Sequence, residues 1–396
     1  MKTALAFILL CLPFILPAED APFKQAIQPL AFSFPADHAS HAGYQTEWWY
    51  VTGNVKDEKG REFGYQFTIF RRSLSPKSAN ERGRTSAWAA SDFYLLHLAI
   101  SDIEGNKHVD FESLERGALG VAGATDVSSL LKERPQHSHF PEVKPMPKGT
   151  LEPYVSVWMN NASFALYRNG WLLKAASPRI GFELELSESD EKSIPITLHG
   201  KRDEEGLSRK GPNSGQASYY YSIPRLNTTG VLTLDGKRYG IKSGMSWMDH
   251  EFGSNQLSAD QAGWEWFAIQ LDDGCEYMLY VLRNKDGSIE PNSSGTWTDI
   301  NGCYAYFKID GSNLAPGRIW KSPHSGAEYP LEWTLQLPNA ELRIKPAMDD
   351  QEFHSEQGAK MNYYEGAIRV EGTNLGKPVK GTGYLEITGK NLGGRM

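Results

Sequence analysis

Three consecutive ionisable residues, Asp249, His250 and Glu251, are the strongest candidates for chemistry in this chain. In a β-strand, Asp249 and Glu251 point to one face and His250 points to the other. If the first face is the interior of an aromatic barrel, desolvation and like-charge repulsion raise the pKa of at least one carboxyl group. A carboxylic acid that stays protonated near neutral pH can deliver a proton to an alkene, an ether or an ester oxygen. The alternative is structural, with both carboxylates capping turns or pairing with Arg71 or Arg225.

Aromatic residues offer a second set of candidates, because 11 Trp and 18 Tyr are more than a plain β core of this size requires. Aromatic faces line lipophilic cavities and stabilise a developing positive charge. The residues proposed to form a substrate-binding wall are Trp49, Tyr220, Trp247, Trp264 and Trp266. For any one of them, packing in a barrel core is the simpler interpretation. Trp48 and Trp49 are adjacent, so at most one of them faces a cavity.

Other titratable residues are weaker candidates. His38 and His41 have a metal-like spacing, but they precede any firm strand, so a solvated segment is expected. His97 lies in the apolar run 95–100, where a core histidine bonded to the backbone is expected and an acid–base role is the alternative. Glu365 precedes a strand and can add an acid to an inter-domain cleft, although a plain strand start is the safer interpretation.

Several common catalytic motifs are missing from the sequence. Residues 244–248 fail the nucleophile-elbow pattern at its last position, and there is no His-Glu-x-x-His, phosphate-binding glycine loop or dinucleotide fingerprint. Cys275 and Cys303 are the only cysteines after residue 11. They form either one bridge or two thiols, and without a nearby histidine pair they do not indicate a metal site. No metal or cofactor is therefore predicted.

Strand patterns dominate the elements that must position these residues. Segments such as 63–70, 181–186 and 304–309 alternate polar and apolar residues and are bounded by Gly, Asn and Asp. Helical periodicity is poor, and 118–131 is the best helical candidate. Many short antiparallel strands with glycine-rich turns predict an all-β protein built from barrels or sandwiches.

An internal repeat divides the chain. Residues 230–253 resemble residues 366–389 in their glycines, their apolar alternation and a final aromatic-apolar-acid triplet, which places Asp249 and Glu386 in equivalent positions. His250 and Glu251 therefore distinguish the first copy. The predicted domains are 19–255 and 256–396. The first is the longer because it carries polar insertions, which are typical of loops, at 73–90, 132–149 and 201–218.

The N-terminus indicates export. Residues 1–18 combine Lys2, a short apolar run and a small residue at Ala18, as in a signal peptide. No later stretch approaches transmembrane length, so we expect a periplasmic or secreted protein without stable membrane insertion. A net charge of −7 and a pI near 5.9 do not suggest binding to nucleic acid.

Several motifs closely resemble the AttH-like, carotenoid-hydratase-related family of predicted secreted hydrolases. They are 47–53, 218–226, 247–253, 263–267 and 383–389, and in order they cover nearly the whole chain after the signal. The resemblance implies tandem lipocalin-like barrels. Relatives include hydratases that protonate a carotenoid double bond and fungal enzymes that cyclise polyenes between two domains. It also implies a proton-donating Asp in an aromatic-x-Asp motif, which 247–249 match. Other members are encoded beside lipoprotein-type ABC exporters.

These observations give one main hypothesis. The protein is an all-β pair of lipocalin-like barrels from an internal duplication, and it binds a lipophilic small molecule near the domain junction. Asp249 donates a proton in hydration or hydrolysis, tuned by Glu251 or His250. The alternative is a carrier without chemistry that serves an envelope ABC transporter. An eight-stranded barrel has an interior suited to one small ligand, which fits both.

Overall fold

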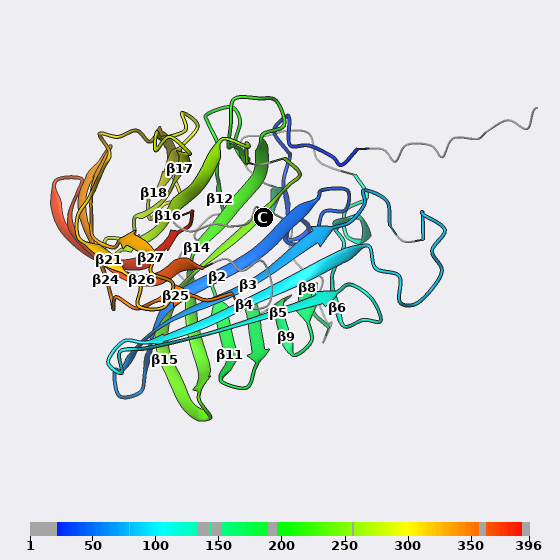
Figure 1. Cartoon of the computed structure of the whole chain (residues 1–396), viewed down its shortest axis with the longest axis horizontal. Helices are drawn as coiled ribbons and strands as arrows, with labels where there is room; N and C mark the ends of the chain where they lie inside the picture. The colour runs from blue at the N-terminus through cyan, green and yellow to red at the C-terminus, as the bar shows by residue number, and fades with distance from the viewer. Residues whose placement is uncertain are drawn as a thin grey trace, which may run out of the picture.

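The computed structural model describes residues 22–78, 80–133, 142–143, 152–168, 170–188, 196–255, 257–355 and 362–389. Within these ranges the chain is almost entirely β-structure, arranged in two large antiparallel sheets (Figure 1). The helical turns there are two short 3₁₀ segments, η1 (Ala36–His38) and η2 (Val127–Ser129). No helix in the described ranges is long and apolar enough to cross a membrane. The predicted signal peptide, residues 1–18, lies outside them.

The first sheet has 13 strands and closes almost completely into a barrel. Its order is β5 (Lys107–Arg116), β4 (Asp92–Asp102), β3 (Glu62–Ser73), β2 (Thr46–Asp57), β15 (Lys237–Gly253), β14 (Ala217–Leu234), β11 (Ile180–Ser187), β10 (Gly170–Ala176), β9 (Ala162–Tyr167), β8 (Val155–Met159) and β6 (Ala122–Ala124). Two short strands, β12 (Thr197–Leu198) and β13 (Leu207–Arg209), pair with β14. A parallel pair, β1 (Ser33–Phe34) and β7 (Glu142–Val143), stands apart.

The second sheet has 10 strands and forms a half-barrel. Its order is β19 (Tyr304–Lys308), β18 (Ser294–Thr298), β17 (Glu276–Asn284), β16 (Gln261–Leu271), β27 (Lys377–Ile387), β26 (Tyr363–Asn374), β24 (Ala340–Pro346), β23 (Trp333–Leu337) and β20 (Leu314–Pro316). β25 (Glu352–Phe353) pairs with β26, and β21 (Ile319–Lys321) pairs with β22 (Glu328–Pro330). The predicted boundary at 255/256 falls between β15 and β16, and the division into separate domains stays a prediction.

Both sheets use the same strand order, as an internal duplication requires. In each, four strands follow one another as hairpins, and the first of the four then pairs with the last strand of its half. The closing hairpins both turn on two residues with positive φ, Asp235-Gly236 and Leu375-Gly376, as type I′ turns do. Gly236 therefore corresponds to Gly376, so the match of the two sequences, which set residues 230–236 against 366–372, is out of register at this turn.

The second sheet packs against the outer surface of the first barrel. β27 lies on β2, β26 on β3 and β16 on β14, and Figure 1 shows the yellow-to-red half against the blue-to-green barrel. Between them is an apolar cluster separate from both barrel cores. We call this contact the seam. Its side chains include Trp48, Tyr50, Tyr220, Trp247, Asp249, Glu251, Trp264, Trp266, Glu365, Tyr384 and Glu386.

Some local predictions were wrong. The helix proposed at 118–131 is replaced by β6 and η2, because strand pairing with β8 overrides its weak periodicity. Of the two alternatives for Cys275 and Cys303, the structure has the two free thiols, the first buried and the second exposed. Most of the insertion 132–149 lies outside the described residues, whereas 201–218 contains β13 and the start of β14.

Candidate active site

Alternation along β15 separates the candidate triplet onto two sides of the barrel wall. Met248, His250 and Phe252 face the barrel core, whereas Trp247 belongs to the seam cluster. Asp249 shares the face of Trp247, and its carboxyl accepts a bond from the Trp247 indole. The predicted opposition of His250 to its neighbours is confirmed. The condition that the acids face the barrel interior is not met, because they point out of the barrel and are buried by the second sheet.

Asp249 is held by three donors. Its Oδ1 accepts the Trp247 indole N–H at 2.5 Å and the Ser222 hydroxyl, and its Oδ2 accepts the Tyr220 hydroxyl. Tyr220 in turn accepts the indole N–H of Trp266 on the second sheet at 3.0 Å. Asp249 is only 3% exposed. Burial raises its pKa to about 7, although these hydrogen bonds oppose the shift.

Two further acids reach the seam from the second sheet. Glu365 on β26 and Glu386 on β27 stand directly opposite each other. Burial and the neighbouring charge of Glu386 raise the pKa of Glu365 well above its usual value, and burial raises that of Glu386 to about 7. Tyr50 of the first barrel donates to Glu365 at 2.7 Å, while the other Glu365 oxygen is buried without a hydrogen bond. The seam therefore gathers acids that hold protons near neutral pH.

Glu251 has a cation beside it. Its carboxylate lies 3.3 Å from the Lys210 ammonium and accepts the Ser218 hydroxyl. The Lys210 ammonium also lies 3.9 Å from the centroid of the Tyr280 ring and 5.0 Å from that of Tyr220. After burial, the coulombic effect of Glu251 adds to the raised pKa of Asp249.

Four of the five predicted wall residues lie in the seam: Tyr220, Trp247, Trp264 and Trp266. Trp49 does not, because it faces the core of the first barrel, stacks on His250 and donates to the backbone of His38. Its neighbour Trp48 takes the seam position instead. Trp48, Trp264 and Glu386 are partly exposed, so they form the rim at which the seam meets solvent.

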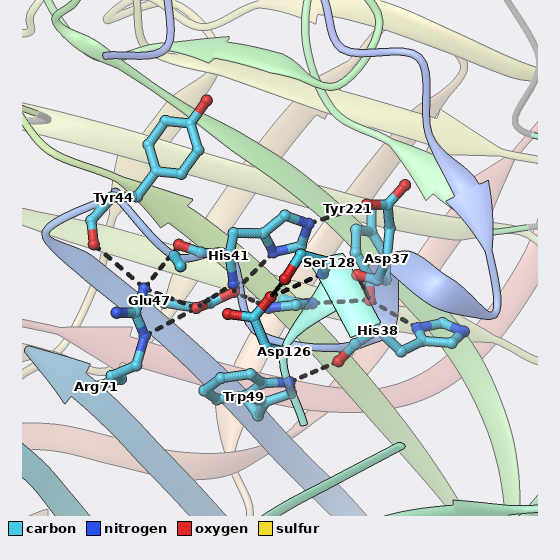
Figure 2. Close-up of polar contacts among 12 residues, drawn as sticks. Asp37, His38, His41, Tyr44, Glu47, Trp49, Arg71, Asp126, Ser128 and Tyr221 are labelled. Carbon is cyan, nitrogen blue, oxygen red and sulfur yellow. Dashed lines mark hydrogen bonds and ion pairs between the residues drawn. The ribbon is translucent and has the colours of Figure 1, made fainter. Parts of the chain in front are cut away.

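A second polar network lies inside the first barrel (Figure 2). Glu47 accepts from His41 at 2.8 Å, from His250 at 2.9 Å and from Arg71 at 3.0 Å. The other ring nitrogen of His41 lies 3.0 Å from Asp37. Against the effect of burial, Arg71 and the two histidines hold the pKa of Glu47 well below its usual range. The expected solvated segment at His41 was wrong, because the segment is buried and supplies this network.

Among the described residues, His41, Glu47 and His250 are the one group of potential metal ligands whose atoms lie within 4.8 Å of one another. Both ring nitrogens of His41 contact carboxylate oxygens, so both must donate and the ring is an imidazolium. Hydrogen bonds to Asp37 and Glu47 raise its pKa despite burial. An imidazolium has no lone pair for a metal, so the geometry fits an ion network.

The remaining candidates lie at the contact between the halves. His97 bonds to the Tyr363 hydroxyl at 2.8 Å and stacks on Phe353. Its ring therefore faces the second sheet and bonds a side chain, whereas a core position and a backbone partner were expected.

A hollow of about 850 Å³ is lined by polar residues that include His108, His324 and His354. A second of about 650 Å³ has a cationic rim. Asp249 lines neither of them.

Sequence reasoning missed His199 and undervalued Glu365. His199 follows β12 and lies in the seam, with its Nε2 2.6 Å from the Ser222 hydroxyl. The sequence around His199 gives no periodic signal, because the strand before it has only two residues and a loop follows it. Glu365 carried a usable signal, because an acid inside an aromatic strand start must be paired or protonated when the strand is buried.

Comparison with known proteins agrees with this architecture. The AttH-like family model matches residues 25–390. An AttH structure from Nitrosomonas europaea superposes with a TM-score of 0.74 at 29% identity, covering 94% of this chain and 100% of that one. The kievitone hydratase structure from Nectria haematococca, at 13% identity, has the same fold, with a TM-score of 0.60 and coverage of 94% and 99%.

Two curated fungal proteins are similar in sequence over a shorter range. Kievitone hydratase of Fusarium solani subsp. phaseoli is 24% identical over 192 residues, which are 47% of this chain and 52% of that protein. Dehydratase asqC of Emericella nidulans is 22% identical over 177 residues, 43% of this chain and 50% of that protein. The chain thus spans about half the length of these curated relatives. With the family model matched over nearly its whole length, the chain belongs to the AttH-like family.

Proposed function

We propose that this protein is a hydro-lyase that adds water to, or removes it from, a carbon–carbon double bond of a lipophilic small molecule at the seam. One observation carries the proposal: Asp249 and Glu386 come from different sheets, interact electrostatically across an aromatic contact, and each has a pKa raised to about 7. Acid–base catalysis at neutral pH works best with groups of that pKa. The similarity to a hydratase and a dehydratase supports this reaction class.

Hydration of an alkene needs an acid and a base in sequence. We assign Asp249 as the acid, because it is the more buried of the two and burial favours its protonated form. Its proton goes to one alkene carbon, and the positive charge that develops on the other is stabilised by the faces of Trp264 and Trp266. Glu386 lies at the partly exposed rim, where water has access, and takes the proton of the attacking water. Dehydration is the reverse.

His250 receives no catalytic role in this scheme. It faces the barrel interior, where it donates to Glu47 and lies 2.9 Å from the Tyr221 hydroxyl. It touches none of the seam acids and serves to order the strand that carries Asp249. Glu251 keeps the tuning role, since its charge disfavours ionisation of Asp249.

The compartment and the substrate are part of the proposal. The signal-like segment 1–18 supports export to the periplasm or medium. The aromatic rim supports a lipophilic ligand in place of a charged one. A carrier that delivers such a ligand to an envelope ABC transporter is the second candidate, and the same seam would serve it.

The test is turnover of lipophilic alkenes, with kievitone included because one relative is named for its hydration. Wild type is expected to form a hydrate, whereas Asp249→Asn and Glu386→Gln lose activity by about 10²-fold or more. Binding is followed separately by quenching of seam tryptophan fluorescence. If all three proteins bind the ligand and none turns it over, the hydro-lyase proposal is refuted and the carrier proposal remains.

A further inference from the structure

A continuous chain of hydrogen bonds runs from Asp249 across to the second sheet. The Ser222 hydroxyl contacts Asp249 Oδ1 and also lies 2.6 Å from His199 Nε2. The other ring nitrogen of His199, Nδ1, lies 3.0 Å from the Thr296 hydroxyl on β18. His199 is 1% exposed, Ser222 is fully buried and Thr296 is 3% exposed. The chain is therefore shielded from bulk water except at its Thr296 end, which is the least buried of the three.

Donors around Asp249 restrict which of its oxygens can hold a proton. Trp247 has only an N–H to offer, so Oδ1 must accept from it. Tyr220 already accepts the Trp266 indole N–H, so its own hydroxyl proton points at Oδ2. Ser222 is the one partner here that can either donate to the carboxyl or accept from it. Among these three partners, Ser222 is therefore the one through which Asp249 can exchange a proton.

This restriction couples Asp249 to the tautomer of His199. When Asp249 is ionised, Ser222 donates to it and must accept from His199, which then carries its proton on Nε2. When Asp249 is protonated, it donates to Ser222, Ser222 donates to Nε2, and the imidazole proton sits on Nδ1 facing Thr296. Burial and the charge of Lys210 hold the pKa of His199 well below its usual value, so the ring stays neutral in both states.

We propose that Ser222 and His199 form a proton relay that returns a proton to Asp249 after each turnover. The proposal rests on the proposed function, since it supplies the step that resets the acid. The Thr296 hydroxyl passes its proton to His199 Nδ1 and regains one from water. The Nε2 proton moves to Ser222, and the Ser222 proton moves to Asp249. One proton enters from water, matching the one that Glu386 releases to solvent.

Several other titratable groups lie near the relay but take no part in the proton transfer. The titratable and charged groups that face Asp249 or His199 are Tyr50, Lys210, Tyr220, Glu251, Glu365 and Glu386. None of them is hydrogen-bonded to His199 among the described contacts. Ser222 and His199 are positioning residues, because they act through Asp249 and do not touch the substrate.

The relay is tested without substrate by NMR of protein labelled with ¹⁵N-histidine, with the His199 signals assigned from His199→Gln. In wild type the ring is expected to change from the Nδ1–H to the Nε2–H tautomer as Asp249 ionises. In Ser222→Ala the tautomer should stay the same across the same pH range. A single tautomer throughout in wild type, or switching that survives Ser222→Ala, would overturn the relay.

Thr296→Val and Thr298→Val form a matched pair for turnover. Both threonines lie on the same face of β18, and Thr298 bonds Thr197 across the seam at 3.1 Å, outside the relay. We expect Thr296→Val to lower kcat by about tenfold or more with KM unchanged, and Thr298→Val to leave both near wild type. Equal effects of the two variants contradict the relay. Tautomer switching without turnover by wild type would instead refute the hydro-lyase and leave the coupling intact.

Discussion

Replacing Asp249 by Asn should make the protein inactive and should remove a loss of stability that wild type undergoes as the pH rises. The acid is 3% exposed, and burial raises its pKa from 3.8 to about 7. A folded state that binds the proton more tightly than the unfolded state loses stability as pH rises between those values. At 1.36 kcal/mol for each pKa unit, the loss in wild type is about 4 kcal/mol by the time the group has ionised. Asn does not titrate, so the variant does not lose this stability as the pH rises.

The assay is urea unfolding, followed by tryptophan fluorescence at pH values from about 4 to about 8. The quantity of interest is the free energy of unfolding of Asp249→Asn minus that of wild type. It should rise by about 4 kcal/mol over this range, whatever constant offset comes from the altered hydrogen bonds. Asp235→Asn is the control, because hydrogen bonds to Arg179 and Lys107 lower the pKa of Asp235 to about 2, so its titration is nearly complete at the acid end. A difference for Asp249→Asn that stays flat with pH would refute the burial argument.

Three further outcomes are expected. In Glu386→Gln, the loss of turnover on the acid side of pH 7 should disappear, because that limb reports ionisation of the base; a retained limb in the pH–rate profile would assign it elsewhere. Arg71→Met should cost about 3–5 kcal/mol of stability, measured by urea unfolding, because it leaves buried Glu47 without its cation; a cost under about 1 kcal/mol would show that the histidines suffice. Tyr50→Phe should raise the pKa of Glu365 further, since the tyrosine hydroxyl stabilises the ionised form; ¹³C NMR of labelled glutamate that shows a fall would contradict the contact.

Local patterns predicted much of the fold because period-two alternation and glycine turns are properties of short segments. They also placed Asp249 and Glu251 on one face of β15 and His250 on the other, as the structure confirms. They did not say which face is the barrel interior. That depends on the second sheet covering β2, β3 and β14 from outside, through contacts between strands that are not neighbours along the chain.

The same limit explains the misplaced histidines. His41 precedes the first long strand and looks solvated by position, yet it is fixed by Glu47 and by Asp37 inside the barrel. His199 follows a two-residue strand, and its proposed role depends on hydrogen bonds to Ser222 and to Thr296 of the other sheet. Partners brought together by tertiary packing give no periodic signal along the chain.

Hydration at the seam is tested most directly by measuring whether deuterium from D₂O is incorporated at carbon in the product. Wild type and Asp249→Asn are incubated with lipophilic alkenes in D₂O, and the products are analysed by mass spectrometry. We expect wild type to form a hydrate with one non-exchangeable deuterium on carbon, delivered by Asp249, and the variant to form none. Hydrate formed equally by both proteins, or bound alkene recovered unchanged from wild type, would contradict acid catalysis by Asp249.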